Sequence, residues 1–278
     1  MGGGKKSFGP EALSAMATRI GDIHIARDDF VATVIIDRPP VNSMSVDLMR
    51  DLADALEELG KDGATRAVVL ATRGKVFCAG ADLTRRADEI GIAARADSPG
   101  TNPLYDQAVR LFSTELPIVA AIQGAAVGAG LGLAMVADIR IATPEARFTA
   151  NFVKLGFHPG FGLTYTLPRL IGRGPAEVMF LTGARLDAQE ALRIGLVNEI
   201  VLEKDLLSAA QTHAASIAQN APLAVRSTRK TLRADLAACV RAATDREFEE
   251  QLWLMKTDDF REGVKAVNER RPGDFKGC

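Results

Sequence analysis

A run of alternating glycines at residues 127–138, VGAGLGLAMVAD, restricts the fold more than any other part of this sequence. Gly128, Gly130 and Gly132 lead into an apolar helical pattern that ends at Asp138. A helix that begins directly after a glycine turn leaves its first main-chain N–H groups unpaired, and the helix dipole makes that end partly positive. The pattern therefore predicts a helix start that binds either a phosphate or the oxyanion that forms on a reacting carbonyl.

The known phosphate-binding motifs do not fit this run. The dinucleotide fingerprint G-x-G-x-x-G requires a third glycine where Leu133 stands, and the sequence contains no G-x-x-x-x-G-K-[ST]. An oxyanion site requires a second N–H donor, and the segment CAGADL at residues 78–83 offers Ala81 after another strand and glycine turn. A purely structural interpretation stays open, in which both glycine stretches serve tight turns and close helix packing.

Composition excludes several classes of protein. The 278 residues carry a formal charge of −1, which argues against nucleic acid as the main partner because phosphate neutralisation needs a basic excess. Cys78, Cys239 and Cys278 are odd in number and far apart, so neither a disulfide framework nor a metal site is expected. Apolar runs are short, so we expect no membrane span and no secretory signal. These features predict a cytoplasmic protein.

Strand and helix patterns alternate over the first two thirds of the chain. Strands are expected as a hairpin within 23–37 and at 66–72, 118–122, 138–143 and 195–201. Ser45 is expected to cap a helix in which leucines recur at helical spacing. After residue 174 the pattern is helical almost throughout, which predicts an α/β fold with a helical C-terminal lobe.

We therefore expect three parts in the chain. Residues 1–20 are interpreted as an N-terminal extension or a cloning remnant, residues 21–203 as the core, and residues 204–278 as the helical lobe. The charged segment 84–103, which contains proline and glycine, is expected to form a surface loop or a mobile flap.

Five stretches of the sequence together resemble the crotonase superfamily, the enoyl-CoA hydratase/isomerase family. They read RPPVNSMS, VFCAGADL, AAIQGAAVGAGLGLAMVADIRIAT, LGFHPGFGLTYTLPRLIG and LTGARLDAQEALRIGLVNEIV, in the order and spacing of the family. The resemblance covers about residues 22–277, including the ending NERRPGDFKG. It implies a spiral of ββα repeats, a helical lobe that forms trimers or hexamers of two trimers, and a substrate carried as a coenzyme A thioester without a further cofactor.

The resemblance also implies the residues of the site. Its oxyanion hole falls on the main-chain N–H groups of Ala81 and Ala129, which are the donors that the two glycine turns offer. The adenine pocket falls along residues 79–83, and Arg270 matches a basic residue that helps to hold coenzyme A in relatives. The expected substrate-binding residues are Cys78, Ala79, Gly80, Asp82, Leu83, Gly128, Gly132, Phe152, Gly160 and Arg270.

Three positions depart from the catalytic pattern of the family. Hydratases of this family use two glutamates, whose positions are occupied here by Gly132 and Phe152. Relatives that isomerise double bonds or displace halide carry an acid at the position of Gly160. None of these residues can transfer a proton, and a positioned acid or base contributes about 10²–10⁴-fold to a rate. The standard mechanisms are therefore not expected.

His158 is the expected replacement for the missing acids. It lies in GFHPGFG, the turn that faces the substrate in the family, and imidazole titrates near neutral pH. We expect either His158 or a bound water to move the proton, and a surface histidine bonded to backbone remains the alternative for His158. Tyr105 and Tyr165 are further candidate hydroxyl donors.

The sequence predicts an enzyme that stabilises the enolate of an acyl-CoA thioester at Ala81 and Ala129. Double-bond migration, hydration of an unusual enoyl group and hydrolysis of an activated acyl chain all fit this chemistry. The alternative is an acyl-CoA-binding or carrier protein that has lost its catalytic groups. The missing carboxylates favour the carrier, whereas the two intact turns favour the enzyme.

Overall fold

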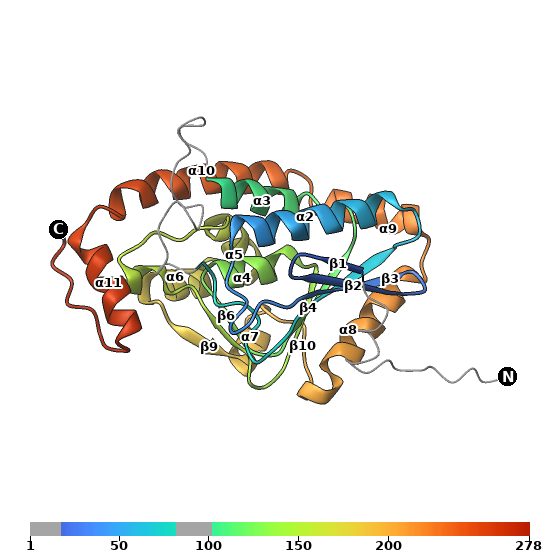
Figure 1. The fold of residues 1–278 in the computed structure, drawn as a ribbon, viewed down its shortest axis with the longest axis horizontal. Coiled ribbons are helices and arrows are strands. Elements are labelled where there is room, and N and C mark those ends of the chain that lie inside the picture. Colours follow the sequence, from blue (N-terminus) through green and yellow to red (C-terminus); the bar gives the residue numbers. More distant parts are fainter. Residues whose placement is uncertain (1–17, 82–101) are drawn as a thin grey trace.

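The computed structural model describes residues 18–81 and 102–278. Within them, seven strands form one sheet in the order β1-β2-β3-β4-β5-β7-β10 (Figure 1). Their bounds are Thr18–Ile20, Ile23–Asp28, Val31–Ile36, Ala67–Thr72, Ile118–Ile122, Ile139–Ala142 and Glu199–Ile200. The pairs β1–β2 and β2–β3 are antiparallel, and every pair from β3 to β10 is parallel. A mixed α/β fold, as expected, is therefore present.

The central strands β3, β4 and β5 are mainly apolar runs that are buried on both faces. All six residues of β3 are buried, as are the first five residues of β4. A strand covered on both sides has no solvent face on which to place polar residues, so it shows no alternation. This is why the sequence identifies these strands by composition and length and not by period.

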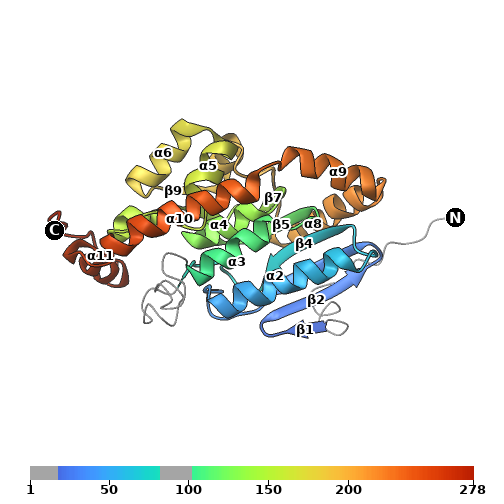
Figure 2. The ribbon, with the colours of Figure 1, turned by 90° about the horizontal axis from the view of Figure 1, so that it is seen from above.

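Helices cover both faces of this sheet. Their bounds are α2 Val46–Lys61, α3 Pro103–Phe112, α4 Ala129–Val136, α5 Leu163–Ile171, α6 Arg173–Thr182, α7 Ala188–Arg193, α8 Glu203–Ala218, α9 Pro222–Leu232, α10 Leu236–Leu254 and α11 Asp258–Asn268. The Ser45 hydroxyl accepts the Leu48 N–H at 3.2 Å, so the expected cap of α2 is present. Figures 1 and 2 show α2, α3 and α10 side by side on one face.

The opposite face is covered by α8. Its buried residues Leu206, Ala210, Ala214 and Ala218 form one apolar cluster with residues of β3, β4, β5 and β7. The segment from residue 204 onward was expected to form a separate lobe. The structure instead places residues 204–218 against the core sheet, because that sheet face would otherwise expose its apolar side chains to water.

Four short strands lie where the sequence predicted none. Residues Thr18–Ile20 form β1 and pair with β2, so they belong to the sheet and not to the expected N-terminal extension. Arg185–Asp187 forms β9 in a small second sheet with β6 (Ala125–Val127) and β8 (Arg147–Thr149). Three residues are too few to show an alternating pattern, which explains why the sequence did not reveal these strands.

The helix that follows the glycine run lies inside the molecule. All eight residues of α4 are buried, and Gly128 precedes its first residue with φ +54°. Such a dihedral is free of strain only for glycine. Among the described residues, no helix is both long and apolar enough to cross a membrane.

Candidate active site

The two glycine turns lie against each other. Cys78 N–H donates to Ala125 O at 3.0 Å, and Val127 N–H donates to Cys78 O at 3.0 Å, which pairs the two segments as parallel strands. A Cβ atom on Gly80 would lie 2.7 Å from Val127 O and 3.4 Å from Ala129 N. This approach therefore requires glycine at position 80, where φ is +83°.

Both predicted N–H donors are without an acceptor. Ala129 is the first residue of α4, so its N–H has no partner inside the helix. Ala81 pairs with Met44 as an isolated bridge, in which Met44 N–H donates to Gly80 O at 2.9 Å. Within residues 18–81 and 102–278, no group accepts a hydrogen bond from the N–H of Ala81 or of Ala129.

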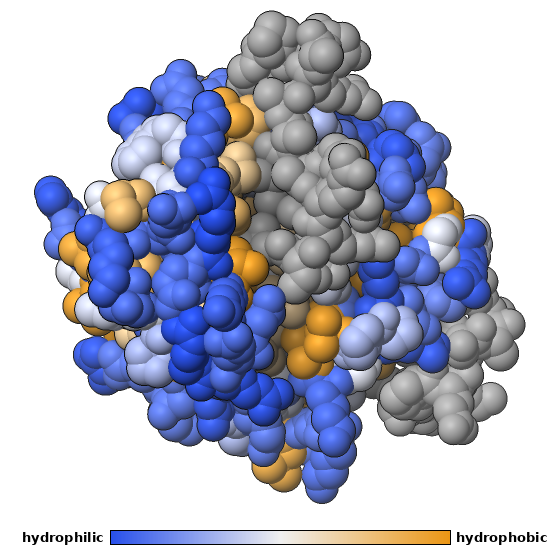
Figure 3. Space-filling view, turned by 60° about the vertical axis from the view of Figure 1, so that its left-hand side comes forward, coloured by the Kyte–Doolittle hydropathy of each residue, from blue (hydrophilic) through white to orange (hydrophobic). Residues whose placement is uncertain are grey.

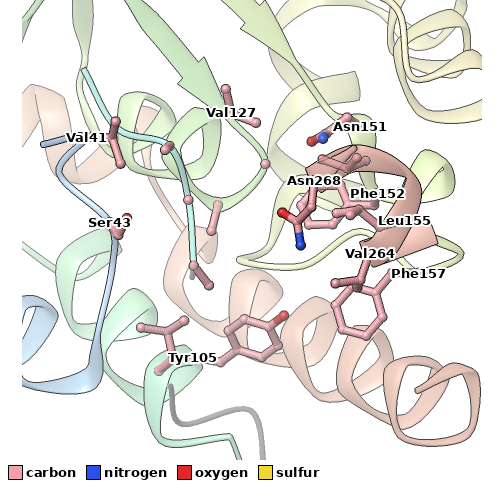
Figure 4. Close-up of a pocket in the computed structure, with 17 residues that line it drawn as sticks. Val41, Ser43, Tyr105, Val127, Asn151, Phe152, Leu155, Phe157, Val264 and Asn268 are labelled. Carbon is pink, nitrogen blue, oxygen red and sulfur yellow. The ribbon is translucent and has the colours of Figure 1, made fainter. Parts of the chain in front are cut away.

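Ala81 and Ala129 line the same cavity, whose volume is about 300 Å³. The described residues that line it are Val41, Ser43, Ala79, Gly80, Ala81, Leu104, Tyr105, Val127, Gly128, Ala129, Asn151, Phe152, Leu155, Phe157, Val264, Val267 and Asn268. They include no carboxylate, imidazole, ammonium or guanidinium group. The cavity lies between the glycine turns, α3, the 3₁₀ helix η1 (Asn151–Leu155) and α11 (Figure 4).

The surface at the α11 end of the molecule carries both apolar and hydrophilic residues. Figure 3 turns the α11 end toward the viewer and shows apolar residues near the middle of the face, bordered by hydrophilic residues. The described groups thus provide a mainly apolar site with two main-chain donors in its wall. Such a site suits a ligand with one carbonyl group and an apolar chain.

Gly132 does not line the cavity, although it was expected to face the substrate. A Cβ atom at this position would lie 2.5 Å from Phe161 Cδ1, and Phe161 is fully buried. The Phe161 ring therefore fills the space into which a side chain at position 132 would project. Phe152 does line the cavity, and its ring Cζ lies 3.5 Å from the Cβ position of Gly128.

Tyr105 occupies the space beside Gly160. A Cβ atom on Gly160 would lie only 2.0 Å from the Tyr105 hydroxyl oxygen. Tyr105 O–H donates to Gln251 Oε1 at 2.8 Å, and Gln251 Nε2 donates to the carbonyls of His158 at 3.0 Å and Pro159 at 3.1 Å. Those two carbonyls determine which end of the Gln251 amide carries the N–H groups. The Tyr105 proton is consequently held by Gln251.

Tyr105 lines the cavity as a neutral phenol. Burial raises the pKa of its hydroxyl, and the negative charge of Glu247 raises it further. Figure 4 shows the hydroxyl directed toward the side of the cavity on which Phe152 and Asn268 lie. The sequence offered Tyr105 only as a candidate donor. The structure shows that Tyr105 donates its proton to Gln251 and therefore does not offer it to a ligand.

His158 lies apart from the oxyanion turns. Its Nδ1 is bonded to Pro159 O at 2.8 Å, and it lines a second cavity of about 540 Å³ together with Trp253 and Cys278. Phe157 lines both cavities and stands between them. The structure therefore does not bring His158 to Ala81 and Ala129, because the imidazole turns back onto its own backbone on the other side of Phe157.

The remaining expected site residues divide into three groups. Cys78 is buried, its Sγ donates to Asn42 O at 3.0 Å, and burial raises the pKa of its thiol to about 12, so it is a packing residue. Arg270 is exposed after α11 and does not line the cavity, although Asn268 does. Asp82 and Leu83 lie outside the described residues.

The expected flap lies mostly outside the described residues as well. At its end, the Asn102 side chain caps α3 by accepting the Leu104 N–H at 2.9 Å, and Pro103 opens the helix. Proline is well suited to the first position of a helix, where its missing N–H costs nothing. In the described part of the chain, no group of three His, Cys, Asp or Glu residues could hold a metal ion.

Comparisons of the sequence and the fold with known proteins point to one family. The family model for enoyl-CoA hydratase/isomerase matches residues 27–278. The chain is 34% identical over 254 residues to the short-chain-enoyl-CoA hydratase of Clostridium acetobutylicum, covering 91% of this chain and 96% of the relative. It is 33% identical over 257 residues to the crotonyl-CoA hydratase of Syntrophomonas wolfei, covering 91% and 97%.

A solved structure shows the same fold. The enoyl-CoA hydratase/isomerase of Pseudoalteromonas atlantica superimposes with a TM-score of 0.81 at 30% identity, over 92% of this chain and all of that one. The match of sequence and fold extends over nearly the whole chain. The protein therefore belongs to the enoyl-CoA hydratase/isomerase family, the crotonase superfamily, and is an enzyme of that family.

Proposed function

We propose that this enzyme acts on an acyl-CoA thioester whose carbonyl oxygen accepts hydrogen bonds from the N–H groups of Ala81 and Ala129. The observation that carries the proposal is the pair of unpartnered N–H groups in the wall of one apolar cavity. The named activities of the two hydratases described above, on short-chain enoyl-CoA and on crotonyl-CoA, support a thioester ligand.

These two donors would stabilise an enolate. When a proton leaves the α-carbon, negative charge develops on the thioester oxygen, and fixed N–H groups in a dry site stabilise that charge without having to reorient. The N-terminal end of α4 adds the positive end of a helix dipole at the same place. Removing one such donor typically lowers kcat by about 10²–10³-fold.

We assign the proton transfer to a bound water molecule. Gly132, Phe152 and Gly160 carry no acid, and His158 faces the other cavity. Tyr105 stays protonated and donates to Gln251, so it holds a water or a substrate hydroxyl by accepting a hydrogen bond.

The test is exchange of the α-proton. The enzyme is incubated in D₂O with a panel of enoyl-, 3-hydroxyacyl- and 3-ketoacyl-CoA thioesters, and deuterium uptake and products are followed by mass. We expect deuterium at the α-carbon. In the variant Ala129→Pro, which removes one N–H at a helix position that tolerates proline, exchange should fall by about 10²-fold or more.

Glu203→Pro is the matched control, because Glu203 is the first residue of α8 and is exposed. It should leave the exchange rate within about twofold, since it alters no group of the cavity. Tight binding of acyl-CoA without exchange or product would contradict the enzymatic proposal and support the carrier alternative. Hydration of crotonyl-CoA at the rate of an ordinary hydratase would contradict the assignment of proton transfer to water.

A further inference from the structure

A third cavity, of about 450 Å³, is lined mainly by cationic and polar residues. Its described lining residues are Phe112, Ser113, Thr114, Glu115, Arg226, Ser227, Arg229, Lys230, Arg233 and Ala237. It lies between the end of α3, α9 and the start of α10. Figures 1 and 2 place α9 and α11 at opposite ends of the molecule, so this cavity is separate from the acyl cavity that α11 lines.

Positive charge at this cavity exceeds negative charge. Asp138 lies beneath it and pairs with Arg229 Nε at 2.9 Å and with Arg233 Nε at 3.3 Å. One carboxylate therefore forms ion pairs with two guanidinium groups. Arg226 and Lys230 add two cations among the described lining residues, and Glu115 is the acid there.

A further guanidinium lies next to the same carboxylate. Arg140 is buried and donates to the carbonyls of Leu196 at 2.7 Å and Ala137 at 2.6 Å. Burial lowers the pKa of Arg140 to about 10, and the charge of Arg233 also acts to lower it. Burial likewise lowers the pKa of Arg233 to about 10, and the charge of Arg229 adds to this. The single negative charge of Asp138 therefore cannot neutralise the positive charges of Arg140, Arg229 and Arg233.

Three buried polar atoms beside this cavity have no hydrogen-bond partner among the described residues. They are Arg229 Nη2, Arg233 Nη1 and Thr114 Oγ1, and all three belong to residues that line the cavity. The Arg229 residue is 8% exposed. Leaving a buried donor unpaired is energetically costly, so this arrangement calls for an acceptor.

The other donors of the two arginines are already used. Arg229 Nη1 donates to Thr114 O, and Arg233 Nη2 donates to Val136 O at 2.7 Å. The unpaired N–H groups are therefore not accounted for by the ion pairs with Asp138. An ordered water would accept from them but would leave the excess positive charge in place. An anion satisfies the donors and the charge together.

We propose that this cavity binds a small anion that carries phosphate groups. Planar guanidinium groups present paired N–H donors that match phosphate oxygens, and the ammonium of Lys230 adds a point charge at the rim. The volume lies within the range of small-molecule sites, so a diphosphate or a phosphorylated metabolite fits better than a single chloride.

Pyrophosphate binding, measured by calorimetry at constant ionic strength, tests this proposal. Arg226 and Lys230 are the residues to change, because neither pairs with Asp138 and the buried network stays intact. The double variant Arg226→Gln/Lys230→Gln should bind pyrophosphate at least about tenfold more weakly than wild type. The control Arg173→Gln/Lys204→Gln makes the same charge change at exposed positions outside the described cavities and should bind as wild type does.

A competition arm distinguishes two sources of phosphate. If saturating coenzyme A displaces pyrophosphate, the cavity holds the diphosphate of coenzyme A; if it does not, the ligand is a separate phosphorylated molecule. Both results require the anion site. Absence of pyrophosphate binding to the wild type, or equal binding by the two double variants, would overturn the proposal and leave ordered water as the partner of the unpaired donors.

Discussion

At Gly132 the space of a missing side chain is filled by the ring of Phe161. Phe161 is fully buried and adopts φ +64°, a left-handed conformation that a bulky residue rarely accepts. A glutamate at position 132 would collide with this ring at its Cβ atom. Placing an acid at position 132 therefore requires a change at position 161 as well.

The stability of Gly132→Ala tests this packing. Replacing a glycine by alanine within a helix ordinarily stabilises a protein by about 0.5–1 kcal/mol. At Gly132 the added methyl group meets Phe161, so we expect the free energy of unfolding to fall by about 1–3 kcal/mol. Urea denaturation measures the difference.

Gly174→Ala serves as the control for that experiment. Gly174 lies in α6, and a Cβ atom there meets nothing within 4 Å. This variant should be as stable as wild type or slightly more so. If Gly132→Ala were stabilised to the same degree, the ring of Phe161 would not occupy the space we assign to it.

The helix α5 begins with a cap that comes from another helix. Gly162 precedes α5 and has no side chain, so Glu247 of α10 takes its place. The Glu247 carboxylate accepts Gly162 N–H at 2.8 Å, Thr164 N–H at 2.9 Å and the Thr164 hydroxyl at 2.6 Å. Burial raises the pKa of Glu247, while these three bonds act in the opposite direction. The contact ties α10 to the element that follows the Gly160 turn.

Removing this cap should destabilise the protein. Glu247→Ala leaves the first N–H groups of α5 without a partner in a buried place, and we expect a loss of about 2–3 kcal/mol in the free energy of unfolding. Glu249→Ala, two residues away on the exposed side of α10, should change it by less than about 0.5 kcal/mol. Equal effects of the two variants would show that Glu247 does not cap α5.

The C-terminal segment is held to α11 by Glu262. This carboxylate accepts the Arg271 guanidinium, with Nη2 to Oε2 at 3.0 Å, and Asp274 N–H at 2.9 Å. The bond to Arg271 and then the bond to Asp274 hold the pKa of Glu262 at about 2. A depressed pKa means that the stabilising contribution is complete above the usual pKa of a glutamate and is lost as pH falls through about 2.

A carboxyl titration followed by NMR measures this effect. In wild type we expect Glu262 to titrate near pH 2. In Arg271→Gln its midpoint should move toward the ordinary value of about 4.3, because the charged donor is gone. Arg261→Gln, which removes the neighbouring pair with Asp258 on the same helix, should leave the midpoint unchanged. A midpoint near 4 in wild type would contradict the bond to Arg271.

For the whole molecule, helices α8 and α10 from the C-terminal third complete the core. The apolar cluster between α8 and the sheet joins residues that are far apart in the sequence, such as Ala210 and Val69. Helix α10 contributes Leu236, Val240 and Phe248 to the main apolar cluster. The expected trimer or hexamer stays a prediction that sedimentation of the intact protein would check. The core and the C-terminal helices are therefore expected to unfold together.

Charge placed in this cluster should destabilise the entire protein. Ala210→Asp buries an unpaired carboxylate between α8 and the sheet, and we expect a loss of about 3–5 kcal/mol in a single cooperative transition. Ser208→Asp on the exposed face of α8 should have little effect. A separate low-temperature transition in Ala210→Asp, with the sheet still folded, would show that α8 is not part of the core.

Local sequence patterns sufficed to predict the buried strands and the Ser45 cap, and the five motifs sufficed to indicate the family, whereas the role of the Ala81 and Ala129 N–H groups stays a prediction. The strands and the cap depend on composition, on the length of apolar runs and on helix termini, which are properties of neighbouring residues. Packing between distant segments alone determined that Tyr105 stands beside Gly160, that Phe161 fills the space at Gly132 and that His158 turns away from the cavity. Such contacts depend on how separate helices, strands and turns pack against one another in space. No single stretch of sequence contains that information.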